Sequence, residues 1–309
     1  MTLTTSDQDG PPMNNDLRFT QNFLHNKALV TRLVAAADLK PGDRVLEIGP
    51  GRGIITEALA ARVGPQGYLT TVELDATFAA RLAERFRDTP QVTVIAGNVL
   101  ALDLTAAYAD QHVFSNVPFN ITSEILDLLF TRDRSPARAH LILQRDALIS
   151  TSAYGDGETL KSLWIKPRYR VSVAHSFARS DFAPQPAVDT ALFRFDRLDA
   201  PLIPPEQYAL YKDFVAFVSK DRVGEGAWRK AYTGRGLKAL EQSGQLIAGR
   251  GIKSQTAAAM VDAFRIFLTD PAKRGVVSGA HAALRQEQQQ RDAITRAGGH
   301  HRSRGRPRR

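Results

Sequence analysis

The chain has 309 residues, 43% of them hydrophobic, so it can form one large domain with a sizeable core and a smaller domain beside it. It contains no cysteine, which excludes disulfides, thiolate catalysis and cysteine-ligated metal sites, and its seven histidines show no ligand spacing except one adjacent pair, so we expect no metal. The net charge of +9 favours nucleic acid as a partner, although eight arginines beyond residue 280 carry much of it.

The first residues of the chain show no targeting segment. Residues 1–16 are polar and lack the basic start and apolar stretch of a signal peptide, and we interpret them as a disordered arm. No apolar run in the sequence approaches the roughly 20 residues that span a bilayer. We therefore expect a cytoplasmic protein that does not contact a membrane.

Strands and helices alternate along residues 17–200. A helix is predicted over residues 27–37, and apolar strands are predicted over residues 44–48, 68–73, 91–96, 112–115 and 139–143. Helices are predicted between them over residues 54–63, 76–87 and 123–130. This alternation is typical of an α/β fold with a doubly wound, mostly parallel sheet. Strands 170–177 and 191–195 follow each other without a helix, which predicts an antiparallel pair at one edge.

Prolines at 201, 204 and 205 mark a domain boundary. Beyond them only helical patterns occur, over residues 206–218, 228–232, 237–242 and 256–268, which predicts a small helical domain at 201–270. Residues 271–309 are rich in alanine, glutamine and arginine and offer too little apolar surface for a core, so we expect a disordered, arginine-rich tail.

The first motif that carries chemistry is Glu47-Ile-Gly49-Pro-Gly51-Arg-Gly53, directly between a predicted strand and a predicted helix. Glycines let the backbone turn tightly and approach a ligand, and the helix beyond supplies unpaired N–H groups. Glu73 ends the next strand, where a carboxylate can bind both ribose hydroxyls of a nucleoside. A glycine-rich turn without a ligand is the other interpretation, and the flanking strand and helix disfavour it.

The second motif is Asn116-Val117-Pro118-Phe119, just after the predicted strand 112–115. An exocyclic adenine amine is a poor nucleophile because its lone pair is conjugated into the ring. Acceptors at its hydrogens, from the Asn116 side chain and the Val117 carbonyl, would favour the attacking form of the nitrogen. Pro118 stiffens the turn, and Phe119 offers a face for an extruded base. Taken alone, the motif also fits an Asn-Pro turn before a core aromatic residue.

The spacing of the first motif resembles motif I of class I SAM-dependent methyltransferases, and the second resembles the N-x-P-[FY] motif of enzymes that methylate amines of adenine or cytosine. Together with Gln21–Leu24 and Phe182–Val188 they resemble the rRNA adenine N6-methyltransferase family over about residues 17–270. That family includes the erythromycin-resistance (Erm) enzymes and the small-subunit adenine dimethyltransferases. Val117, Phe119 and the arginine-rich tail look more like Erm proteins, since small-subunit enzymes usually carry Leu and Tyr at the first two positions.

The resemblance implies a class I methyltransferase domain at residues 17–200 that uses S-adenosyl-L-methionine (SAM), with an RNA-binding helical domain after it. It implies that the cofactor is bound by Asn22, Leu24, Gly49, Gly51, Gly53, Glu73, Asn98 and Asn116. Asn98 is a departure, because the family usually has Asp there to accept from the adenine amine of the cofactor, and an amide accepts without charge assistance. Phe182 resembles the aromatic residue on the far side of the target base.

We therefore expect a monomeric enzyme that methylates N6 of an adenine in 23S rRNA, once or twice, and so confers macrolide, lincosamide and streptogramin B resistance. One alternative is a small-subunit 16S rRNA adenine dimethyltransferase of ribosome assembly. A second is a non-catalytic nucleic-acid-binding protein on a methyltransferase scaffold. Nine basic residues between 132 and 179 are either RNA contacts or a solvated charged face.

Overall fold

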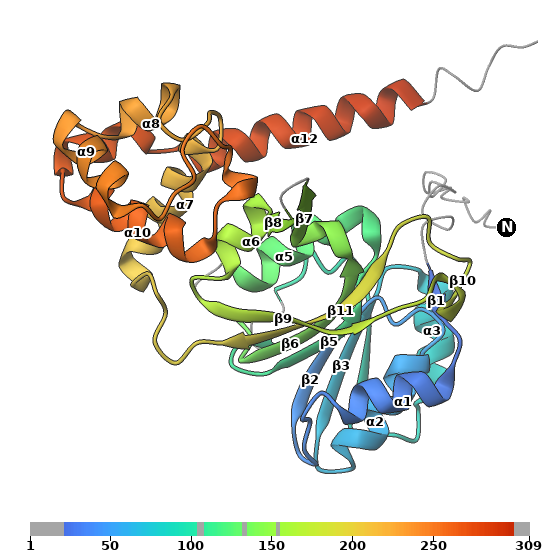
Figure 1. Cartoon of the computed structure of the whole chain (residues 1–309). Helices are drawn as coiled ribbons and strands as arrows, with labels where there is room; N and C mark the ends of the chain where they lie inside the picture. The colour runs from blue at the N-terminus through green and yellow to red at the C-terminus, as the bar shows by residue number, and fades with distance from the viewer. Residues whose placement is uncertain (1–21, 104–107, 132–134, 153–154, 300–309) are drawn as a thin grey trace, which may run out of the picture.

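The computed structural model describes residues 22–103, 108–131, 135–152 and 155–299. Figure 1 shows an α/β domain that contains the N-terminal half of the chain, with a helical domain beside it and one long helix that extends away from the helical domain. The expected arm at residues 1–16, together with Gln21 of the Gln21–Leu24 segment, lies outside the described residues. So does the end of the expected tail, residues 300–309.

Within the described residues, the main sheet has seven strands in the order β4-β3-β2-β5-β6-β11-β9. They are β2 (Arg44–Ile48), β3 (Tyr68–Glu73), β4 (Val92–Ala96), β5 (His112–Asn116), β6 (Arg138–Gln144), β9 (Tyr169–Ser176) and β11 (Thr190–Arg197). Strands β2 to β6 pair in parallel, whereas β11 pairs antiparallel with both β6 and β9. The doubly wound sheet and its antiparallel edge are thereby confirmed. The strand order reverses between β2 and β5, the position at which such sheets bind their ligands.

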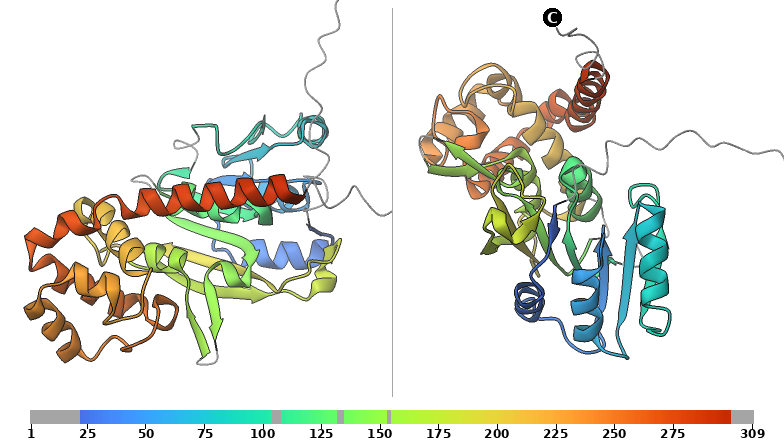
Figure 2. Two further views of the ribbon diagram at one scale, coloured as in Figure 1. Left: turned by 90° about the horizontal axis from the view of Figure 1, so that it is seen from above. Right: turned by 90° about the vertical axis from the view of Figure 1, so that its right-hand side faces the viewer.

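Helices cover both faces of this sheet (Figures 1 and 2): α1 (Lys27–Ala35), α2 (Ile54–Val63), α3 (Ala76–Arg85) and α5 (Thr122–Phe130). On one face, buried apolar residues of α1 and α2 pack against residues such as Phe114. On the other face, Phe130 of α5 stacks on Phe195 with 4.4 Å between the ring centroids. Side chains of Asn26 and Asp75 accept hydrogen bonds at the starts of α1 and α3, which fixes where these helices begin.

Several short elements are absent from the sequence prediction. Strand β1 (Phe23–Leu24) pairs antiparallel with β10 (Phe182–Ala183), although more than 150 residues separate them. Strands β7 (Ile149–Ser152) and β8 (Gly155–Glu158) form a hairpin that leads into α6 (Leu160–Ile165). The 3-10 helices among the described residues are η2 (Phe119–Ile121), η3 (Arg145–Ala147), η4 (Arg179–Asp181), η5 (Ile252–Ser254) and η6 (Pro271–Lys273).

The helical domain contains α7 (Pro205–Val218), α8 (Gly226–Ala231), α9 (Gly234–Ser243) and α10 (Ala257–Leu268). Its core is rich in aromatic residues, and Trp164 of α6 belongs to it although α6 precedes the predicted boundary at residue 201. The Tyr208 hydroxyl donates a hydrogen bond of 2.6 Å to the Trp164 carbonyl. In packing terms the helical domain therefore begins with α6.

The prediction that residues 271–309 form a disordered tail is wrong for the part that the structure describes. That part forms α11 (Arg274–Val277) and α12 (Ala280–Gly299). Val277 and Ala280 are buried in the helical core, and Leu284 packs against it. These few apolar positions are enough to dock the start of α12, which composition averaged over the whole tail concealed.

Candidate active site

The loop between β2 and α2 is built by three glycines with left-handed backbone: Gly49 (φ +66°), Gly51 (φ +53°) and Gly53 (φ +79°). Side chains are disfavoured in this conformation, so the residue type follows from the turn. Space imposes the same requirement, because a Cβ on Gly49 would lie 3.3 Å from Pro118 Cγ and one on Gly51 would clash with the Phe23 ring. The glycines therefore let Pro118 and the Phe23 ring pack directly against the loop backbone.

Glu73 ends β3 beside this loop and is only 1% exposed. Its Oε2 accepts a hydrogen bond from Gly51 N, and its Oε1 accepts one from Asp75 N, both at 2.9 Å. These bonds fix the carboxylate at the carboxyl edge of the sheet, and each oxygen keeps a second lone pair for a donor such as a hydroxyl.

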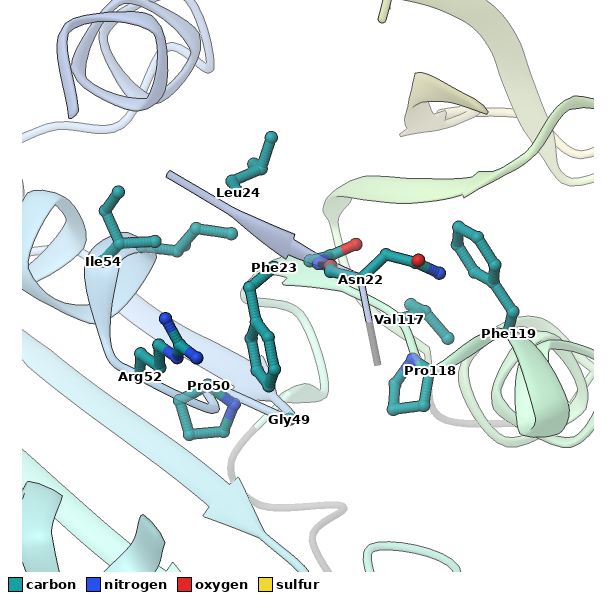
Figure 3. Close-up of a pocket in the computed structure, with 12 residues that line it drawn as sticks. Asn22, Phe23, Leu24, Gly49, Pro50, Arg52, Ile54, Val117, Pro118 and Phe119 are labelled. Carbon is teal, nitrogen blue, oxygen red and sulfur yellow. Dashed lines mark hydrogen bonds between the residues drawn. The ribbon is translucent and has the colours of Figure 1, made fainter. Parts of the chain in front are cut away.

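Two hollows meet at this edge and share Gly49 and Pro118. The first is drawn in Figure 3 and is lined by Asn22, Phe23, Leu24, Gly49, Pro50, Arg52, Ile54, Ile55, Asn116, Val117, Pro118 and Phe119. The second contains Glu73 and Asn98 together with Leu74 and Leu100, whose side chains are 51% and 36% exposed. Carboxylate and amide acceptors between exposed apolar side chains suit a purine nucleoside, and the first hollow continues from it towards the second motif.

Asn116 stands where β5 ends, at the wall of the first hollow. Its Nδ2 donates a 2.8 Å hydrogen bond to the Asn22 carbonyl. This bond fixes the orientation of the amide, in which Oδ1 is the atom that can accept a hydrogen bond. Pro118 follows the buried Val117, and Phe119 begins a 3-10 turn. In Figure 3 the rings of Phe23 and Phe119 lie on opposite sides of Asn22.

Phe182 does not line either hollow. It is 2% exposed and packs edge-on against Phe177, with 5.2 Å between the ring centroids. The expectation that it offers a face to the target base is wrong for this structure. The cause is the β1–β10 pair, which places Phe182 opposite Leu24 and in the same core cluster.

Asn98 does lie in the second hollow, but its Oδ1 already accepts a 3.0 Å hydrogen bond from Leu100 N. Glu124, in the first turn of α5, lines the same hollow and adds a carboxylate that the sequence analysis missed. Leu74 was also missed. Leu74 could have been predicted as a site residue from its position directly after Glu73. Glu124 could have been predicted from its position in the first turn of the helix that follows the second motif.

Glu47, the first residue of the glycine motif, points into the protein and does not line either hollow. It is 1% exposed and accepts a 2.7 Å hydrogen bond from the Thr56 hydroxyl. Burial, with a smaller contribution from the neighbouring Glu73 charge, raises the pKa of Glu47 to about 8. Glu47 therefore has a structural role in the motif, because its hydrogen bond with Thr56 connects β2 to α2 on either side of the loop.

Most of the basic residues between 132 and 179 that the structure describes are engaged within the protein. Arg138 pairs with Asp196, Lys161 with Asp127, Lys166 with Glu158 and Arg179 with Asp189. Arg168 lies over the Tyr208 ring. A continuous RNA-binding patch made of these residues is therefore not supported, and the interpretation as structural charge pairs fits them better.

The remaining candidates for reactive groups are His140 and clusters of possible metal ligands. His140 is buried in β6, and burial lowers its pKa to about 4, so it is a neutral strand residue rather than a base at the cleft. In the part of the chain that the structure describes, no group of three or more His, Asp or Glu side chains is arranged to hold a metal ion. Nor does any helix in that part combine the length and apolar character that a bilayer crossing requires.

Comparison with known proteins identifies the family. A family model described as ribosomal RNA adenine dimethylase matches residues 13–267, which is most of the chain. The chain belongs to this family. The enzyme is 36% identical over 189 residues to ribosomal RNA small subunit methyltransferase A of Synechococcus elongatus, covering 57% of this chain and 67% of that one. It is 33% identical over 230 residues to the protein of the same name from Syntrophotalea carbinolica, covering 71% and 82%.

Among solved structures, the enzyme is similar to the 23S rRNA methyltransferase ErmE, with a TM-score of 0.67 and 24% identity over 80% of this chain and 99% of that one. A dimethyladenosine transferase from Plasmodium falciparum has a TM-score of 0.61 and 18% identity over 82% and 98%. At these identities the likeness concerns the fold. The protein is thus a class I, SAM-dependent rRNA adenine methyltransferase with a C-terminal helical region, and the non-catalytic alternative is set aside.

The expectation of a 23S rRNA substrate with macrolide, lincosamide and streptogramin B resistance is wrong. Curated relatives that match the chain in sequence, among them those from Synechococcus elongatus and Syntrophotalea carbinolica, are named as small-subunit enzymes. The Erm-like features were Val117, Phe119 and the arginine-rich tail. Val for Leu and Phe for Tyr preserve an apolar side chain and a stacking face, so these exchanges discriminate poorly between substrates.

Proposed function

We propose that the protein methylates N6 of an adenine in 16S rRNA, the RNA of the small ribosomal subunit, with SAM as methyl donor. The observation that carries this proposal is the first hollow, in which the Asn116–Phe119 segment adjoins the glycine loop at Gly49 and Pro118. The names of the curated relatives support the choice of the small subunit.

In this proposal the second hollow takes the nucleoside half of the cofactor. The Glu73 carboxylate accepts from the ribose hydroxyls while it keeps its bonds to Gly51 and Asp75. Asn98 and Glu124 face the adenine edge, and Leu74 packs against the ring. The methionine half lies along Gly49, Gly51 and Gly53 towards Asn22 and Leu24. When bound, SAM supplies a methyl group that its sulfonium already activates.

The first hollow orients the adenine amine. Asn116 Oδ1 and the Val117 carbonyl accept hydrogen bonds from the two N–H groups of the amine. This turns the nitrogen lone pair out of the ring plane and towards the methyl group. Because Pro118 has no N–H, it presents no competing donor at this point. Phe119 stacks on the flipped base. Catalysis then comes from alignment and preplaced acceptors, which agrees with the absence of Asp, Glu, His and Lys side chains among the described residues that line this hollow.

The test offers the purified protein two substrates in separate reactions, 30S subunits that carry unmodified 16S rRNA and 50S subunits that carry unmodified 23S rRNA. Radiolabelled SAM reports transfer, and mass spectrometry of nuclease digests locates the modified adenine. We expect label in 16S rRNA as N6-methylated adenine, and none with Asn116→Ala. Label confined to 23S rRNA, or label on a base other than adenine, would overturn the proposal.

A further inference from the structure

A third hollow lies beside the first one, between the glycine loop and α3. Its lining consists of Gly51, Arg52, Phe78, Arg81, Leu82 and Arg85. Its volume of about 460 Å³ falls within the range of about 300–1,000 Å³ that is usual for pockets that hold a small molecule. Of these residues, only Gly51 takes part in the proposed binding of SAM. The hollow therefore has room for a further ligand.

The rim of the third hollow carries an excess of positive charge. Arg85 Nη2 donates a 2.7 Å hydrogen bond to Glu57 Oε2, and Lys27 Nζ lies 3.1 Å from the same oxygen. One carboxylate is therefore shared by two cations. Arg52 and Arg81 are exposed, and neither forms an ion pair with an acidic side chain of the described residues. Four cations against one carboxylate leave three positive charges in excess.

The acidic residues of α3 and of its cap do not neutralise this charge. Glu84 is paired with Arg87, with 2.8 Å between its Oε1 and the guanidinium. The Asp75 carboxylate accepts hydrogen bonds from two backbone N–H groups at the start of α3. Neither carboxylate lines the third hollow. An anion that enters it consequently meets arginine side chains, whose planar donor groups match the oxygens of a phosphate.

Arg52 connects the third hollow to the first, because it lines both. Its guanidinium lies over the Phe23 ring, 5.1 Å from the centroid, and its carbonyl accepts a 3.3 Å hydrogen bond from Arg85. Figure 3 shows Arg52 and Phe119 on opposite sides of the Phe23 ring. A polynucleotide that leaves the first hollow past Phe23 therefore reaches Arg52 and then the third hollow.

The apolar part of the lining comes from Phe78 and Leu82 of α3. Phe78 is half-buried and contacts Phe23 edge-on, with 5.9 Å between the ring centroids, whereas Leu82 is buried. Aromatic side chains interleaved with arginines are typical of sites for single-stranded nucleic acid, because the ring contacts the base while the guanidinium holds the phosphate. The lining therefore suits one nucleotide of such a strand.

We propose that the third hollow binds the rRNA strand next to the target adenine, with a phosphate held by Arg52 and Arg81 and the rest of that nucleotide against Phe78. Arg85, which Glu57 holds in place, adds positive charge and fixes the backbone of Arg52. The contact does not depend on base sequence, since phosphate contacts position a nucleic acid without reading it. The inference rests on the proposed function only for the identity of the RNA.

Arg81 and Arg62 provide a matched pair for the first test. Arg81 is exposed and lines neither of the other two hollows, and Arg62 is an exposed arginine at the end of α2 remote from the glycine loop. Arg81→Gln should weaken binding of polyuridylate at least several-fold and lower its salt slope by about 0.7, the value for one phosphate contact of a single strand. Arg62→Gln should bind like the wild type, and calorimetry should show unchanged SAM affinity in both. Equal RNA affinity and salt slope in the two variants would refute the proposal.

A second test locates the RNA directly. The chain contains no cysteine, so a substituted cysteine is its single thiol. Ala80 is exposed beside Arg81 on α3, and Ala61 is exposed near the remote end of α2. Ala80→Cys and Ala61→Cys are labelled with tethered Fe-EDTA and bound to 30S subunits carrying unmodified 16S rRNA. We expect cleavage next to the target adenine from position 80 and not from position 61. Cleavage there that is no stronger from position 80 would count against the proposal.

Arg52→Gln distinguishes a contact with RNA from a contact with the cofactor. Because Arg52 also lines the first hollow, the carboxylate of SAM is the other anion that it could bind. We expect Arg52→Gln to lower polyuridylate affinity while SAM affinity, measured by calorimetry, stays at the wild-type value. Lower SAM affinity with unchanged RNA affinity would assign Arg52 to the cofactor and overturn its place in the proposal.

Binding of polyuridylate keeps this inference distinct from the proposed function. If the wild-type protein fails to methylate 30S subunits, the proposed function fails. A polyuridylate affinity that is lower in Arg81→Gln than in Arg62→Gln would then still uphold the third hollow as a site for an RNA strand. If methylation of 30S subunits succeeds but the two variants bind polyuridylate and 30S subunits equally well, the third hollow alone is refuted.

Discussion

Leu24 and Phe182 face each other across the two-residue antiparallel pair formed by β1 and β10. Leu24 lines the first hollow with part of its surface, and Phe182 supports it from the core. The wall of the active site that carries Asn22 and Phe23 is therefore held in place by a strand from the other end of the catalytic domain.

This relationship predicts what substitution of Phe182 does. Phe182→Ala should destabilise the protein by about 3–5 kcal/mol, the usual range for a buried phenylalanine, and weaken SAM binding through the loosened wall. Phe182→Leu fills most of the space and should retain both stability and methyl transfer. Chemical denaturation and single-turnover assays measure the two effects. A stable Phe182→Leu variant without activity would mean that the ring itself contacts the base.

Glu73 should determine cofactor affinity. Glu73→Ala removes a charged acceptor and should weaken SAM binding by about 1.5–3 kcal/mol. Glu73→Gln retains one acceptor oxygen and should fall between this variant and the wild type. Titration calorimetry reports the affinity, with the exposed Glu84→Ala as a matched control on α3. Equal SAM affinity in the wild type and Glu73→Ala would show that the ribose does not bind at Glu73.

Asn116 and Phe119 should separate orientation of the amine from stacking of the base. Asn116→Ala should abolish methyl transfer while the protein remains folded, since the residue stands at the end of β5 and is only partly buried. Phe119→Ala should reduce transfer, and Phe119→Tyr should be tolerated because the stacking face survives. Single-turnover rates on 30S subunits measure all three variants, and turnover near the wild-type rate in Asn116→Ala contradicts the proposal.

The buried carboxyl of Glu47 predicts a dependence of stability on pH. Its pKa is raised from 4.5 to about 8, so the folded state binds a proton that the unfolded state has released over this interval. Stability from this group is therefore fully present below pH 4.5 and is lost as the pH rises to about 8. Glu47→Gln should remove that dependence. Denaturant unfolding of both proteins across the interval tests this, and parallel curves would contradict a protonated Glu47.

The sequence was sufficient to predict elements whose signal is local. β2, α2 and β3 have the bounds that apolar periodicity predicted, because each buries its own pattern of residues. The glycine loop and the segment from Asn116 to Phe119 do meet at the carboxyl edge, as expected from the order of strands. β1 and β10 have two residues each, and their pairing depends on the tertiary fold, so no window of sequence reveals it.

The partners of the charged residues were predicted less well than the topology of the sheet. Lys161 looked like a candidate RNA contact, yet its ammonium is buried against Asp127, and burial lowers its pKa. A sequence lists basic residues but does not state which acidic residue folds against each of them. For the same reason the composition of the tail concealed the hydrogen bonds that Asp213 accepts at the start of α12.

The position of α6 has a practical consequence for chimeric enzymes. Trp164 and Leu163 are buried in the helical core, where their carbonyls accept from the hydroxyls of Tyr208 and Tyr211. A chimera joined at Pro201 would pair these residues with a foreign helix α7 and deprive their two carbonyls of the tyrosine hydroxyl donors. A junction before Thr159, the residue that caps α6, transfers the whole contact set with the graft. Exchange of the helical domain between relatives should therefore succeed with a junction at residue 159 and fail with one at residue 201.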